Sequence, residues 1–209
     1  MCLLLALTGG DAGPVDRHVF DFVIGHRGQF LIDTASSFVA LGEAVPLLVI
    51  CLLWGALVVV PLGGERQRWT KQQFVQASVP LLVFLVTAAV VALLKQVIGR
   101  SGPADVLRSS LVHSLAFPSG HAALSAGVLF ASAFLLAFDS PFLGRTRLVI
   151  IGVALGISLM VTFSTVVLFM HWPTDAVAGT AIGVLIAALV LAAADRSIGG
   201  SAGIPISET

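Results

Sequence analysis

Residues 77–98 read ASVPLLVFLVTAAVVALLKQVI, an apolar run whose only charged residue, Lys95, lies close to its C-terminal end. An α-helix needs roughly 20 predominantly apolar residues to cross the hydrocarbon core of a bilayer. The run therefore predicts a transmembrane helix that carries a single cation near one membrane face.

The rest of the chain repeats this pattern. Four further runs are apolar enough to span a bilayer: residues 38–61, 119–138, 148–170 and 176–194. Of the 209 residues, 57% are hydrophobic and 11% are charged, whereas soluble domains carry roughly 25% charged residues. The formal net charge is zero, which gives nucleic-acid binding no electrostatic basis. We predict a single membrane-embedded domain over residues 1–209, an all-α, polytopic transmembrane helical bundle with five full spans.

Two segments precede the first full span. Met1 to Leu7 is apolar but too short to cross a bilayer, and we expect a truncated first helix there, with a frayed tail in front of five spans as the alternative. Residues 11–35 interleave charged and apolar side chains, a spacing typical of a short amphipathic helix on a membrane surface. The motif-bearing core then extends from about residue 77 to residue 194.

Three polar clusters lie at the ends of the apolar runs. They are Lys95 with Arg100, then Pro118-Ser119-Gly120-His121, then His171 with Asp175. Ionisable groups at membrane depth are costly and indicate function by default. If the spans alternate in direction, all three clusters meet at one membrane face.

The basic residues of the loops orient the bundle. Six of them share the face opposite the polar clusters: Arg66, Arg68, Lys71, Arg145, Arg147 and Arg196. Cytoplasmic loops carry an excess of Lys and Arg. We therefore predict a multi-pass protein of the plasma membrane whose polar clusters face the extracytoplasmic side.

The third cluster has the spacing of a nucleophile and its partner. The Asp175 carboxylate, four residues after His171, can accept a hydrogen bond from one ring nitrogen and leave the other as a nucleophile. Judged alone, an interfacial histidine followed by a helix-starting aspartate explains the pair equally well.

The first two clusters have the features of an anion site. Ser119 is a natural N-cap, and the free amides of a first helical turn bind anions. Gly120 leaves room for a phosphate oxygen, and His121 can donate a proton to a leaving oxygen. Lys95 can neutralise a phosphate, although a lysine at a helix C-terminus also suits the dipole and can extend its amine to the interface.

Two further features bear on this site. The spacings Gly152/Gly156 and Gly179/Gly183 predict close approach of the fourth and fifth spans, which would bring His171 near His121. Glu43 lies near the outer end of the first full span. It is interpreted as a group lining the site entrance or as an ordinary carboxylate in a first helical turn.

In order and spacing, these clusters resemble the type 2 phosphatidic acid phosphatase superfamily, which is related to the vanadium haloperoxidases. The family pattern is a lysine, six residues and Arg-Pro, then Pro-Ser-Gly-His, then Ser-Arg, five residues, His, three residues and Asp. The positions that match here are Lys95, Pro103, Pro118 to His121, Ser164, His171 and Asp175.

Two positions depart from that pattern. Gly102 and Thr165 stand where the family has arginines, whose forked donors cradle the phosphate and are poorly replaced by lysine. Arg100 is the nearest substitute, and we expect its side chain to point toward the gap between His121 and His171. Gly102 and Thr165 are expected to leave space for a larger headgroup, such as a pyrophosphate.

The resemblance implies a metal-independent phosphatase, without a cofactor, that acts on a lipid phosphate or isoprenyl pyrophosphate in the bilayer. His171 would form a phosphohistidine, Asp175 would orient it, and His121 would protonate the leaving group and then activate water. Four residues would hold the phosphate oxygens: Lys95, Arg100, Ser119 and Gly120. A lipid phosphotransferase with the same site, or a non-catalytic lipid-phosphate-binding or assembly protein, is the alternative.

Overall fold

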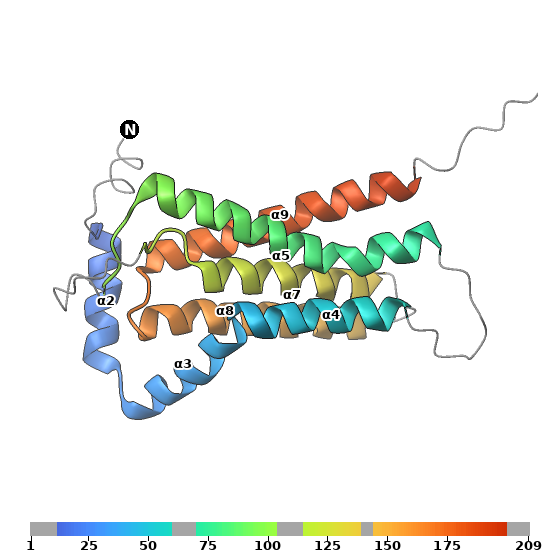
Figure 1. The fold of residues 1–209 in the computed structure, drawn as a ribbon. Coiled ribbons are helices and arrows are strands. Elements are labelled where there is room, and N and C mark those ends of the chain that lie inside the picture. Colours follow the sequence, from blue (N-terminus) through green and yellow to red (C-terminus); the bar gives the residue numbers. More distant parts are fainter. Residues whose placement is uncertain (1–11, 60–69, 104–114, 139–143, 200–209) are drawn as a thin grey trace, which may run out of the picture.

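A computed structural model describes residues 12–59, 70–103, 115–138 and 144–199 (Figure 1). Seven helices lie in these ranges: α2 (Pro14–His26), α3 (Gln29–Leu41), α4 (Ala44–Val59), α5 (Lys71–Ile98), α7 (Gly120–Phe138), α8 (Arg145–Val167) and α9 (Pro173–Gly199). The predicted helix at Met1 to Leu7 lies outside the described residues, as do Arg66 and Arg68.

The predicted membrane bundle is confirmed. Four of the described helices, α5, α7, α8 and α9, are long and apolar enough to cross a membrane. Helices α3 and α4 together form a further candidate span, bent by 48°. The predicted span over residues 38–61 is not a single straight helix where the structure describes it, because the chain leaves the helical path at Gly42 and Glu43.

A glycine at the break between α3 and α4 allows close packing. Gly42 is buried, and a Cβ atom there would collide with Val161 of α8 and press on His121 of α7. Only glycine therefore lets α3 end so close to the bundle. Pro46 follows in the first turn of α4, where the missing amide hydrogen costs no helical hydrogen bond.

The amphipathic segment predicted at residues 11–35 is divided between α2 and the start of α3. Helix α2 lies across one end of the bundle (Figure 1). Pro14 occupies the first turn, where proline is well tolerated. The face that α2 turns to the bundle buries Phe20, Val23 and a charged residue, Asp16. An acid in that position was not expected from the sequence, and its partners are described below.

Helix α7 runs through the centre of the bundle and packs against α5, α8 and α9 (Figure 1). Its crossing with α9 depends on glycine, since a Cβ atom on Gly179 or Gly183 would overlap backbone carbonyls of Ser119 or Ala123. The glycine spacing thus joins α9 to α7 and not to α8, which corrects the sequence-based pairing. A Cβ atom added to Gly152 or Gly156 of α8 would meet no described atom within 4 Å.

Gly183→Ala is therefore expected to destabilise the protein, because the backbone of α7 cannot move away without disturbing the whole core. Overpacking of this kind typically costs about 1–3 kcal/mol, which would lower the melting temperature by several degrees. Thermal unfolding in detergent measures the change. Gly156→Ala is the matched control and should melt with the wild type. Equal melting temperatures for the two variants would contradict this packing.

The structure confirms that the spans alternate in direction and bring the polar clusters to one end of the bundle. The ends that carry Lys95, His121, His171 and Asp175 all lie at the end of the bundle covered by α2 (Figure 1). A second group of basic residues starts or ends helices at the opposite end: Lys71, Arg145 and Arg196. The three polar clusters can therefore act as one site.

Candidate active site

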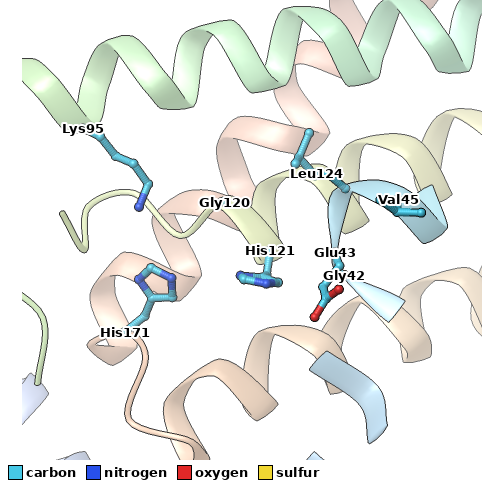
Figure 2. Close-up of a pocket in the computed structure, with 9 residues that line it drawn as sticks. Gly42, Glu43, Val45, Lys95, Gly120, His121, Leu124 and His171 are labelled. Atoms are coloured by element: carbon cyan, nitrogen blue, oxygen red, sulfur yellow. The ribbon is translucent and has the colours of Figure 1, made fainter. Parts of the chain in front are cut away.

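A pocket of about 490 Å³ opens at the α2 end of the bundle. Its polar side chains are Glu43, Lys95, His121 and His171, and Figure 2 shows them pointing toward one space. The remaining lining residues are Gly42, Ala44, Val45, Gly120 and Leu124. The structure thus brings together both histidines, the lysine and the glycine that were predicted to share a site.

His171 lies in the turn between α8 and α9 and is buried. Its Nδ1 lies 2.7 Å from the carbonyl oxygen of Ala116. Because a carbonyl only accepts hydrogen bonds, Nδ1 carries the proton and Nε2 keeps its lone pair. Burial and then the positive charge of Lys95 lower the pKa of His171 to about 3. The imidazole is therefore neutral at physiological pH, the form that can act as a nucleophile.

The backbone of α8 sets the position of this turn. The amides of Met170 and His171 both donate to the carbonyl oxygen of Thr165, at 2.9 and 3.2 Å. Phe169 adopts a positive φ of 59° directly before them, which reverses the chain toward α9. The turn thus presents His171 to the pocket from the end of α8.

Helix α2 holds the same turn from outside. Phe20 packs against Phe169 and Trp172, with ring centroids 4.6 and 5.1 Å away. Arg27 lies over the Phe169 ring and donates to the carbonyl oxygen of Val167 at the end of α8. The amphipathic helix therefore positions the loop that carries His171.

Lys95 approaches the pocket from the last turn of α5 (Figure 2). Its ammonium group donates to the carbonyl oxygen of Leu115, which forms an isolated β-bridge with Ser101. A backbone carbonyl neutralises no charge, so the ammonium remains available to an anion in the pocket. Lys95 therefore lines the pocket, and its contact with a phosphate stays a prediction.

Gly120 and His121 open α7 at the pocket (Figure 2). A Cβ atom on Gly120 would have Val91 at 3.8 Å as its nearest neighbour, so space beside the backbone is available. Ser119, by contrast, is fully buried, and its Oγ accepts from the Ala122 amide as an N-cap. Ser119 therefore shapes the start of α7 and does not line the pocket, contrary to its predicted contact with substrate.

The structure corrects the predicted role of Asp175. Its Oδ1 accepts from Arg100 at 2.5 Å and its Oδ2 accepts from the Trp172 amide at 3.0 Å. Neither oxygen is bonded to the His171 ring, whose proton goes to Ala116 instead. A backbone carbonyl, which has no signature in sequence, supplies the contact that was assigned to Asp175.

Arg100 also lies elsewhere than predicted. Its guanidinium is buried between two carboxylates, Asp175 at 2.5 Å and Asp16 of α2 at 2.6 Å. Asp16 further accepts from the amide and hydroxyl of Thr174. Arg100 therefore fastens α2 to the start of α9 and does not point into the gap between His121 and His171.

The two positions that depart from the family motifs are also away from the pocket. Thr165 is fully buried and donates to the Thr162 carbonyl within its own helix. Gly102 is buried and does not line the pocket. The expectation that these residues leave space for a larger headgroup is therefore wrong.

The described residues contain no group of three or more His, Cys, Asp or Glu side chains arranged to hold a metal ion. The polar groups that face the pocket are a lysine, two imidazoles and one carboxylate. The lysine and the imidazoles suit a phosphate, which an ammonium group binds by charge and hydrogen bonding, whereas the carboxylate does not.

Comparison with known proteins identifies the family. Residues 73–198 match the PAP2 superfamily. The chain belongs to the PAP2 superfamily. It is 35% identical to phosphatidylglycerophosphatase B of Bacillus subtilis (strain 168) over 192 residues, which cover 91% of this chain and 88% of that protein. The resemblance drawn from the motifs is confirmed.

Two solved structures share the fold. A transmembrane PAP2-type phosphatidylglycerolphosphate phosphatase from Bacillus subtilis superimposes with a TM-score of 0.74 at 25% identity, covering 93% of this chain and 94% of that one. LpxE of Aquifex aeolicus gives a TM-score of 0.65 at 17% identity, covering 86% and 96%, and this likeness concerns the fold alone. The PAP2 match at residues 73–198 covers nearly all of α5, all of α7 and α8 and nearly all of α9, but it excludes α2, Asp16 and Glu43.

Proposed function

We propose that this PAP2 protein hydrolyses a lipid phosphate in the bilayer through a phosphohistidine at His171. The observation that carries the proposal is the His171 ring itself, neutral, with Nδ1 bonded to Ala116 and set in a pocket beside Lys95 and His121. A buried imidazole with one fixed nitrogen and one free lone pair is an activated nucleophile.

The reaction follows from this geometry in two steps. Nε2 of His171 attacks phosphorus, and the bond from phosphorus to the lipid oxygen breaks while protonated His121 gives that oxygen its proton. His121, now neutral, takes a proton from water, whose oxygen attacks phosphorus and breaks the phosphorus–nitrogen bond. Inorganic phosphate leaves and both histidines return to their starting states.

Lys95 and the amides at the start of α7 stabilise the charge on the non-bridging oxygens. Charge stabilisation of this kind is commonly the largest contribution to catalysis. Asp175 and Arg100 contribute indirectly in this scheme, by holding the turn that carries His171. The scheme uses no metal ion, because the cationic side chains supply the charge.

The relatives support a phospholipid monoester as substrate. Both the 35% identical protein and the structure with a TM-score of 0.74 are named for phosphatidylglycerol phosphate. An isoprenyl pyrophosphate is the second candidate. The basic residues at the far end of α5, α8 and α9 support an extracytoplasmic site in the plasma membrane.

Phosphate release by purified protein tests the function. The substrates are phosphatidylglycerol phosphate, phosphatidate and an isoprenyl diphosphate in mixed micelles, with and without a chelator. We expect release of inorganic phosphate that the chelator leaves unchanged. Lys95→Ala should lower kcat/KM by about tenfold to a thousandfold, because one of several charge-stabilising groups is lost. Chelator-sensitive release, or full activity in Lys95→Ala, would contradict the scheme.

The same assay separates the alternatives. A phosphotransferase would move the phosphate to an added alcohol or lipid acceptor in preference to water. A non-catalytic binding protein would release no phosphate from any substrate, although it would still retain labelled lipid.

A further inference from the structure

Glu43 has no role in the scheme above, yet its side chain lines the pocket (Figure 2). It is the only carboxylate among the described lining residues. The residue is exposed, so substrate can reach it from outside the bundle. Its position is fixed by the break between α3 and α4, where the neighbouring Gly42 lies against His121.

The positive and negative side chains of the pocket lie at opposite ends. The positive charges of Lys95 and His121 both lower the pKa of His171. His121 interacts electrostatically with two charged groups, Glu43 and Lys95, which lie on opposite sides of it. Figure 2 shows the same order, with Lys95 and His171 at one end, His121 in the middle and Glu43 at the other end. One end of the pocket is therefore cationic and the other is anionic.

The in-line geometry of phosphoryl transfer indicates which part of the substrate lies at each end of the pocket. The attacking and leaving atoms lie roughly in line on opposite sides of phosphorus. With His171 as the nucleophile, the leaving oxygen lies near its proton donor, His121. The first atoms of the leaving group then continue toward Glu43.

We propose that Glu43 is a specificity-determining residue that selects a phosphomonoester with a neutral, hydroxylated leaving group and rejects a diphosphate. The proposal rests on the phosphatase function and names its substrate class. A hydroxyl beside the leaving oxygen, as in a glycerol phosphate headgroup, can donate a hydrogen bond to the carboxylate. A diphosphate would place its second, anionic phosphate there, and repulsion between like charges is an effective way to exclude a competing ligand.

The side chain of Glu43 has no other evident task. Its backbone amide and carbonyl continue the chain through the break, donating to Ala40 and accepting from Leu47. No hydrogen bond or ion pair of its carboxylate occurs among the described contacts. Replacing the carboxylate therefore leaves the described hydrogen bonds of the fold intact.

The test compares kcat/KM for phosphatidylglycerol phosphate with kcat/KM for an isoprenyl diphosphate in the same micelles. The wild type should prefer the monoester. Glu43→Gln should reduce that preference by about two- to fivefold, the range expected for one exposed charge, mainly through faster turnover of the diphosphate. Glu43→Asp should retain most of it. Asp33→Asn is the matched control, because it removes the same charge from α3, where Asp33 accepts a hydrogen bond from Gln29, and it should leave the ratio unchanged.

The possible results are distinguishable. An unchanged ratio in Glu43→Gln, or a wild type that prefers the diphosphate, overturns the role of Glu43 while the phosphatase function stands. A similar change in Asp33→Asn also overturns it, since the effect would then come from net charge. A wild type that releases phosphate from neither substrate overturns the proposed function and this inference with it.

Discussion

His171→Ala is expected to lower the rate of phosphate release by about three or more orders of magnitude. The variant lacks the ring nitrogen that is placed to attack phosphorus in the described pocket. When several groups act as one catalytic unit, removal of one of them abolishes most of the rate enhancement of all. Steady-state turnover on phosphatidylglycerol phosphate measures the loss. Brief incubation with labelled substrate, followed by an alkaline quench, should show an acid-labile phosphoprotein in the wild type and none in the variant.

The control is His18→Ala, which removes an exposed histidine of α2 and should retain wild-type turnover. Because His171 is buried and bonded to Ala116, the melting temperature of His171→Ala should be measured alongside activity. A folded His171→Ala protein that still releases phosphate at the wild-type rate would show that the nucleophile lies elsewhere.

Arg100→Met is expected to destabilise the fold by about 3–5 kcal/mol, the typical cost of leaving buried charges without their partner. The substitution preserves much of the volume but leaves two buried carboxylates, Asp16 and Asp175, facing each other without a cation. Thermal unfolding in detergent measures the effect. Activity should fall too, because α2 and the start of α9 hold the turn that carries His171.

A second substitution tests whether Arg100 acts through this network. Asp16→Asn added to Arg100→Met removes one of the two stranded charges and should recover part of the lost melting temperature. If Arg100→Met instead melts with the wild type and loses only activity, then Arg100 is a phosphate ligand, as the sequence suggested.

The sequence by itself determined the class of protein and the end of the bundle that holds the site. The apolar runs are as long as a bilayer is thick, and length together with apolar composition decides whether a helix can span. Alternation of the spans then places Lys95, His121 and His171 at one end without any knowledge of packing. Their order along the chain was enough to indicate the PAP2 superfamily, which residues 73–198 match.

Only the tertiary structure decided what each polar group contacts. His171 takes its partner from a backbone carbonyl 55 residues away, and every residue of the chain carries such a carbonyl, so the sequence does not single out Ala116. Arg100 pairs with Asp16, 84 residues distant, in a helix that was predicted to lie on the membrane surface. Gly183 lies directly against the Ala123 carbonyl of α7. Gly156 belongs to a glycine pair with the same four-residue spacing, but a Cβ atom there would meet no described atom within 4 Å. Spacing along a chain fixes which side of a helix a residue occupies, but the contact itself depends on which other helix packs there.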